Sequence, residues 1–153
     1  MNCMELNGGV QLMLDLVNRD VIFSIKPKYA DQIMAGIKTV ELRRRFTNEA
    51  PIGARAFIYS SAPAKAMVGY ATIADVRLLR IEEIWKQYRD QTGVSRSEFE
   101  AYFQGRTHGY VIALRDPQRF RSSASMDYLR ERFGFRAPQS YRYAGTEYRA
   151  LIR

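Results

Sequence analysis

The 153-residue sequence contains one cysteine, Cys3, and one histidine, His108. A single cysteine cannot form a disulfide within the chain and is typical of a reducing cytoplasm, which is the compartment we expect. Zinc sites built on several histidines or on a pair of cysteines are excluded by the same counts. We therefore expect neither a metal site nor a cofactor.

Long apolar runs and glycine-rich phosphate-binding motifs are also missing. No segment approaches the about 18 consecutive apolar residues that a membrane-spanning helix needs. The first 20 residues lack the basic and apolar regions of a signal peptide. GxSxG, P-loop and GxGxxG motifs do not occur. The sequence therefore predicts no membrane partner, and it argues against a nucleophile-elbow hydrolase, a P-loop nucleotidase and a dinucleotide-binding enzyme.

Negative charge is in short supply, because 16 Asp and Glu face 24 Lys and Arg, for a net charge of +8. A basic small domain predicts a polyanionic partner such as RNA. Ten tyrosines and eight phenylalanines add rings on which bases can stack. The oligomeric state is left open by these counts.

Hydrophobic spacing divides the chain into a loosely ordered lead-in, residues 1–20, and a single domain, residues 21–153. We expect strands at 21–25, 39–46, 54–61, 64–79 and 109–116, helices at 27–36, 80–93, 94–105 and 123–135, and a last extended segment at 138–143. Residues 118–123 either extend the preceding strand or begin a turn. Because the strands cluster without strict alternation with helices, this order predicts an α+β fold, a small mixed β-barrel with helices packed at its rim.

The segment GIKTVELRRRF, residues 36–46, places one glutamate among four cations. Alternation along a strand turns Val40 and Leu42 to the core and places Glu41 on the opposite face, with Thr39, Arg43 and Arg45. One interpretation is a solvent-exposed ladder of ion pairs, worth ~0–1 kcal/mol. The other is a ligand pocket, in which Lys38 and Arg43 donate hydrogen bonds and Glu41 accepts them, as reading a nucleobase edge requires.

Further candidates lie outside this segment. Tyr59 and Ser60 end a strand with hydroxyl groups that suit the lining of a ligand pocket. Tyr141 offers a ring for base stacking. The cations that we expect to hold RNA phosphates are Lys26, Lys28, Arg43 and Arg45. Arg44 points away from its neighbours in a strand, so the arginine run forms a patch only if the strand ends there.

The stretch SIKPKYADQIMAGIKTVELRRRF, residues 24–46, resembles the opening of ASCH domains, a branch of the PUA-like superfamily. Their G-x-K-x-x-E-x-R pattern is matched by Gly36, Lys38, Glu41 and Arg43. The likeness continues through IYSSAPAKAMVGYATI to PQSYRY, so it covers about residues 21–143, and the closing segment resembles a subgroup with bacterial and phage members. The resemblance implies a PUA-like β-barrel with a cleft between barrel and helices, lined by the motif residues.

The resemblance implies several functions, because relatives bind RNA, recognise modified bases, or act as nucleases or as amidohydrolases on acylated cytidine. In the amidohydrolase branch the motif lysine is kept, as Lys38 is here. A threonine nucleophile stands there at the position of Glu41, so the covalent mechanism does not transfer to this chain.

Three functional readings follow. The first is a module that binds RNA or a modified nucleoside in a cleft formed by the motif. The second is a metal-independent hydrolase, a nucleoside amidohydrolase or ribonuclease, with Lys38 as general base or oxyanion stabiliser and Glu41 as proton shuttle. A basic Lys38 requires a lowered pKa, which burial or Arg43 favours and Glu41 opposes. The third is a small regulatory protein that binds DNA or a partner through its basic surface.

Overall fold

The computed structural model describes residues 19–47 and 52–152. The expected lead-in at 1–20, with Cys3, lies almost entirely outside the described residues. Asp20 is described and is buried at the start of the domain. No helix in the described ranges is long and apolar enough to span a bilayer.

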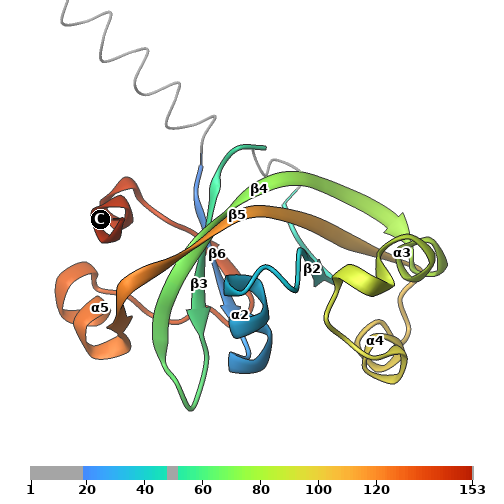
Figure 1. Ribbon diagram of the computed structural model, residues 1–153, viewed down its shortest axis with the longest axis horizontal. Helices are drawn as coiled ribbons and strands as arrows, with labels where there is room; N and C mark the ends of the chain where they lie inside the picture. Colours follow the sequence, from blue (N-terminus) through green and yellow to red (C-terminus); the bar gives the residue numbers. More distant parts are fainter. Residues whose placement is uncertain (1–18, 48–51, 153) are drawn as a thin grey trace, which may run out of the picture.

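One six-stranded sheet, curled into a half-barrel, organises the molecule (Figure 1). Its strand order is β2-β5-β4-β3-β1-β6. The strands are β1 (Val21–Ile25), β2 (Val40–Arg43), β3 (Arg55–Ser60), β4 (Ala66–Arg80), β5 (His108–Ser125) and β6 (Tyr141–Tyr143). β1 and β3 are parallel, and every other neighbouring pair is antiparallel. The α+β barrel-like fold expected from the sequence is thereby confirmed.

Helices occupy the two ends of the long strands and one face of the sheet. Figure 1 shows β4 and β5 bending side by side across the molecule, with α3 and α4 at one end and α5 at the other. The helices are α2 (Pro27–Met34), α3 (Ile81–Tyr88), α4 (Arg96–Tyr102) and α5 (Met126–Phe133). The short 3-10 helix η1 (Arg89–Gln91) follows α3, and a second one, η2 (Thr146–Leu151), follows β6. α2 lies against β3, β4 and β5.

Local signals in the sequence set the ends of the helices near the site. Pro27 begins α2, and Gly36 follows its end with a positive φ of 75°. Ser95 caps α4: its side chain accepts a hydrogen bond from the Glu98 backbone, while the Glu98 side chain accepts one from the Ser95 backbone. Each of these three features acts on the backbone within one turn of its helix end.

Gly69 allows two segments to approach closely. A side chain at this position would place its Cβ 2.3 Å from the Gln118 carbonyl oxygen and 2.6 Å from the Met34 sulfur. The strand register also shifts between Met67 and Gly69. The register shift and the close approach to Gln118 explain why a glycine occupies this position of the strand.

The structure selects one of the two alternatives for residues 118–123, and it differs from the expectations at the end of β2 and in one added 3-10 helix. β5 runs without a break to Ser125, so residues 118–123 extend the strand. β2 ends at Arg43, which places Arg44 and Arg45 in a bend after the strand. η2 was not expected. The length of a strand depends on the backbone hydrogen bonds that its partner strand can make, and β4 pairs with β5 along nearly all of its length.

A hydrophobic cluster joins the end of the sheet to α3 and α4. It contains the stripe expected on the helix at 80–93, with Ile84 fully buried and Ile81, Trp85 and Tyr88 packed around it. Val40 and Leu42 of β2 belong to the same cluster. This packing holds α4 beside β2 and so forms one wall of the cleft described next.

Candidate active site

A cleft of about 530 Å³ lies where β1 and α2 face β2 and α4. A space of this size is typical of a small-ligand site. Charged and aromatic side chains share its surface. Its lining includes Ser24, Lys26, Tyr29, Lys38, Glu41, Leu42, Arg43, Arg44, Val94, Glu98, Phe99 and Tyr102.

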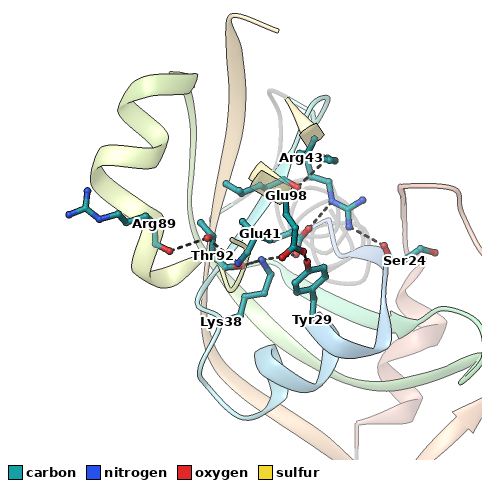
Figure 2. A network of polar contacts seen from close by, with 11 residues as sticks. Ser24, Tyr29, Lys38, Glu41, Arg43, Arg89, Thr92 and Glu98 are labelled. Carbon is teal, nitrogen blue, oxygen red and sulfur yellow. Dashed lines mark hydrogen bonds and ion pairs between the residues drawn. The ribbon is translucent and has the colours of Figure 1, made fainter. Parts of the chain in front are cut away.

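Lys38 lies at the bottom of this cleft and is only 3% exposed. Its Nζ donates a hydrogen bond to the Thr92 carbonyl and lies 3.7 Å from Glu41 Oε2 (Figure 2). The Tyr29 ring centroid is 5.4 Å from the same nitrogen. The ammonium group is therefore held by backbone, carboxylate and ring, with little access to water.

Two local features bring Lys38 to this position. The Gln32 carbonyl at the end of α2 accepts hydrogen bonds from the backbone of Ile37 and Lys38, which turns the chain into β2. Gly93 has a φ of 71°, and a Cβ there would lie 2.2 Å from Gln32 Oε1. Glycine thus lets the loop after η1 come against α2, where the Thr92 carbonyl meets the lysine.

The pKa of Lys38 is lowered from its usual value, and burial is the main cause. The negative charge of Glu41 opposes this shift, and Arg43 adds to it. Burial disfavours the charged form of an amine, and here it outweighs the carboxylate. The sequence named these opposing influences, and the depth of Lys38 decides between them.

The exposed-ladder interpretation of β2 is wrong. All four strand residues are buried, Glu41 and Arg43 included. Arg43 Nε lies 3.3 Å from Glu41 Oε1. Alternation did place Glu41 away from Val40 and Leu42, but α2, α4 and the segment before β6 cover that face as well.

The two terminal nitrogens of Arg43 donate hydrogen bonds within the protein, whereas its buried Nε has no hydrogen-bond partner among the described residues. Its Nη1 donates to Ser140 Oγ at 2.9 Å and to the Ser140 carbonyl at 3.3 Å, and its Nη2 donates to the Ser24 carbonyl at 3.1 Å. The guanidinium also lies 4.9 Å from the centroid of the Phe23 ring. Arg43 therefore orients Glu41 and ties β2 to the far edge of the sheet.

Glu41 Oε2 is buried and has no hydrogen-bond partner among the described residues. The Lys38 ammonium, at 3.7 Å, is a charge partner that stands beyond hydrogen-bond distance. Buried carboxylate oxygens are normally hydrogen-bonded, so an unsatisfied one in a cleft suits a donor that arrives with a ligand.

Tyr29 and Glu98 bridge the two walls of the cleft. The Tyr29 hydroxyl on α2 donates a hydrogen bond to Glu98 Oε2 on α4 (Figure 2). Burial, followed by the hydrogen bond and charge of Glu98, raises the pKa of Tyr29 to about 12. The Tyr29 hydrogen bond, aided by Ser95, lowers the pKa of Glu98 to about 2. At neutral pH the bridge is a neutral phenol on a carboxylate.

Arg44 and Tyr102 form one side of the cleft mouth. The Arg44 guanidinium lies 4.9 Å from the Tyr102 ring centroid. The Tyr102 hydroxyl donates to the Leu42 carbonyl at 3.3 Å and accepts from the Arg44 backbone at 3.2 Å. β2 ends at Arg43, so the condition under which the arginine run can form a patch is met. Lys26, exposed at the end of β1, also lines the mouth.

Sequence reasoning missed Tyr29, Tyr102 and Glu98 as cleft residues. Tyr29 was assigned to the apolar stripe of α2, and Glu98 was assigned only to the capping box. A signal was present, since Glu98 and Tyr102 are four residues apart and share a helix face. Nothing in the sequence indicated that this face looks towards β2.

The other expected site residues lie outside the cleft lining. Tyr59 is buried, with its ring centroid 5.1 Å from that of Phe135, and Ser60 is buried beside it. Thr39 is half-buried, and its backbone bonds to Gln91 and Leu114. The ring centroid of Tyr141 is 4.8 Å from that of Phe46, and Tyr141 packs against the core. Lys28 and Arg45 are exposed near the cleft without lining it.

Within residues 19–47 and 52–152, no group of three or more His, Cys, Asp or Glu is placed to hold a metal ion. The groups that the cleft does offer are an amine with a lowered pKa, an unsatisfied carboxylate oxygen and a phenol.

This chain is similar to known proteins both in sequence and in structure. Residues 18–129 match the family described as "Domain of unknown function (DUF365)". An ASCH domain-containing ribonuclease from Zymomonas mobilis is 32% identical over 137 residues, which are 88% of this chain and 91% of that protein. The crystal structure of ASCH from the same organism superposes with a TM-score of 0.82 at 29% identity, covering 88% of this chain and 94% of the other.

A more distant structure shares the fold alone. The N-terminal domain of McrB from Staphylothermus marinus matches with a TM-score of 0.55 at 12% identity, covering 86% of this chain and 91% of that one.

Proposed function

This chain belongs to the ASCH-domain family and to DUF365, and from that membership we propose that it is a ribonuclease which cleaves RNA in the cleft around Lys38. The observation that carries the proposal is the state of Lys38, a buried lysine whose pKa is lowered at the bottom of a ligand-sized cleft. Strongly shifted groups in clefts are typical of catalytic sites. The related Zymomonas protein is a ribonuclease, which supplies the substrate class.

Lys38 acts as the general base in this proposal. Its neutral Nζ takes the proton of a ribose 2′-hydroxyl, and the 2′ oxygen forms a bond to the adjacent phosphorus. The bond from phosphorus to the 5′ oxygen of the next nucleotide breaks, and that oxygen takes a proton from water. The hydroxide left behind recovers the proton from Lys38. The products are a 2′,3′-cyclic phosphate and a 5′-hydroxyl end.

The surrounding residues position the substrate and the base. Lys26 and Arg44 at the mouth carry the charge to hold phosphates on either side of the reacting nucleotide. The Thr92 carbonyl and Glu41 fix the direction of the Lys38 side chain. Tyr29 keeps its proton at neutral pH and so offers the cleft a neutral wall on which a sugar or base can rest.

A module that binds RNA or a modified nucleoside without cleaving it is the second candidate. The unsatisfied Glu41 Oε2 favours it, since that atom suits recognition of a ligand donor whether or not a bond is broken. Both candidates place a nucleotide in the same cleft. They differ in whether Lys38 is needed for turnover or only for affinity.

The test is cleavage of a labelled single-stranded RNA by wild type, Lys38→Ala and Lys38→Arg, with product ends identified. A general base contributes about 10²–10⁴-fold, so both variants should lose at least about 100-fold in rate. Lys38→Arg keeps a long hydrogen-bond donor in the cleft but supplies no base at neutral pH, because arginine stays protonated. RNA affinity of Lys38→Arg should stay near that of wild type.

Lys86→Ala is the matched control, because Lys86 is exposed on α3 and does not line the cleft. It should cleave as wild type does. Cleavage that survives unchanged in both Lys38 variants would overturn the proposal. Binding without cleavage by wild type would leave the second candidate standing.

A further inference from the structure

We propose that Glu41 makes cleavage selective for guanosine by accepting a hydrogen bond from the N2 amino group of the base. The proposal rests on the proposed ribonuclease function, since it places the 2′-hydroxyl of the same nucleotide at Lys38. It adds a specificity that membership of the family does not supply. The residue that carries it is Glu41, with Lys38 and Arg43 as its neighbours.

The first step is the state of the Glu41 carboxylate. Glu41 is 8% exposed, and its Oε2 is buried without a hydrogen-bond partner among the described residues. Arg43 Nε stands 3.3 Å from Oε1, and Lys38 Nζ stands 3.7 Å from Oε2. Two cations hold the group in place, and one oxygen remains for a donor. A ligand that brings such a donor completes an otherwise unsatisfied acceptor.

The second step is where that oxygen lies relative to the reacting group. Glu41 Oε2 and Lys38 Nζ are neighbours at the bottom of one cleft. A nucleotide that presents its 2′-hydroxyl to Lys38 therefore presents to Glu41 the base edge on the ribose side. In RNA, the 2′-hydroxyl and this base edge lie in the same, minor, groove.

The third step is the chemistry of that base edge. Adenine presents N3 there, and the pyrimidines present O2, which are acceptors that a carboxylate repels. Guanine alone adds a donor, its N2 amino group. A carboxylate at this place therefore favours guanine and disfavours the other three bases. The hydrogen bond is charge-assisted, and such bonds are stronger than neutral ones.

A purely structural role for Glu41 makes a different prediction. If Glu41 only orients Lys38, removing it slows cleavage at every nucleotide by the same factor. If it also reads the base, the loss is larger at nucleotides that carry the N2 amino group than at those that lack it. The two roles separate on base analogues, with no need to change the protein.

The experiment uses DNA oligonucleotides that contain one ribonucleotide, so that a single 2′-hydroxyl is available. That position holds guanosine, inosine, adenosine or 2,6-diaminopurine riboside. Inosine is guanosine without the N2 amino group, and 2,6-diaminopurine is adenosine with it. We expect kcat/KM to be about 10- to 100-fold higher with the amino group in both pairs, the range for one hydrogen bond to a charged group.

The variant Glu41→Gln then tests whether Glu41 causes the preference for the N2 amino group. The neutral amide accepts more weakly, so both ratios should fall towards one. Glu82→Gln, exposed on α3, is the control and should keep both ratios. Equal cleavage of guanosine and inosine by wild type overturns the base-reading role and leaves the ribonuclease intact. Absence of cleavage at all four ribonucleotides and in ordinary RNA overturns the ribonuclease, and the specificity falls with it.

Discussion

Lys38 shows how depth in the fold sets the chemistry of one side chain. The same lysine on the surface would keep its ordinary pKa, because water would solvate its charge. At 3% exposure, burial lowers the pKa of Lys38 even with a carboxylate 3.7 Å away. Glu41 therefore has two effects on Lys38: it holds the side chain in place, and its charge limits the fall of the lysine pKa.

This balance predicts a pH dependence of cleavage. A general base works only when neutral, so kcat/KM should rise with pH through the lowered pKa of Lys38 and then level off. Glu41 raises that pKa by its charge. In Glu41→Gln the rise should therefore move to lower pH, although the rate on the plateau falls. The measurement is kcat/KM against pH on a uridine-containing substrate, where base reading plays no part.

Glu82→Gln serves again as the control and should leave the pH of the rise unchanged. A rise that stays in place or moves to higher pH in Glu41→Gln would show that Lys38 is not the group that titrates. The comparison uses the position of the rise and not its height, so a slower variant remains informative.

The motif residues could be named from the sequence, but their surroundings could not. Lys38, Glu41 and Arg43 stand out as a carboxylate among cations. Strand alternation placed two of them on a solvent-exposed face, because it describes only the near neighbours of a residue. Their burial depends on Thr92 and Ser140, which lie 54 and 97 residues along the chain from Lys38 and Arg43. No local pattern carries that information.

At the scale of elements, one side chain links the two edges of the half-barrel. β2 and β6 are the outermost strands of the sheet. Arg43 on β2 donates hydrogen bonds to Ser140, directly before β6, and to Ser24 on β1. The contact draws the two edges together beside the cleft, so the same guanidinium closes the barrel and orients Glu41.

Removal of this link should destabilise the fold strongly. Arg43→Met keeps an apolar side chain against Phe23 but leaves the buried Glu41 carboxylate without its nearest cation. Breaking a buried ion pair from one side costs about 3–5 kcal/mol. Ser140→Ala removes one hydrogen-bond acceptor of Arg43 and should cost about 1 kcal/mol. Urea unfolding followed by circular dichroism measures both free energies.

Arg121→Ala is the matched control, because Arg121 is exposed on β5 and should change stability by no more than about 0.5 kcal/mol. If Arg43→Met is as stable as this control, the ties to Ser140 and Ser24 contribute little, and Arg43 serves the site alone.

Element ends followed from sequence wherever the signal is local. Pro27, Gly36 and the Ser95–Glu98 capping box mark their helices because each acts within one turn of backbone. The full length of β5 and the end of β2 were not predictable in the same way. Both depend on hydrogen bonds to strands far away in the chain, and a partner strand adds or removes them without any change in the local residues.

At the scale of the whole molecule, the cleft separates the cations that contribute to the net charge of +8 into deep ones and exposed ones. The deep groups, Lys38 and Arg43, are engaged with Glu41 and with backbone carbonyls. Lys26 and Arg44 at the mouth are exposed. Phosphates of a bound strand should therefore meet the mouth residues, while the deep residues meet the sugar and base.

The salt dependence of RNA binding tests this division of roles. Each phosphate contact releases counterions, and for single strands log K falls by about 0.7 per contact for each unit of log salt concentration. Lys26→Ala and Arg44→Ala should each make the slope shallower by up to about that amount, and the double variant by the sum. Lys86→Ala, with the same loss of charge far from the cleft lining, should leave the slope unchanged. Binding is measured by fluorescence anisotropy with a non-cleavable 2′-O-methyl RNA, so turnover does not interfere. Slopes equal to wild type in both mouth variants would mean that the strand crosses another basic surface, and the nucleotide would then enter the cleft from a different side.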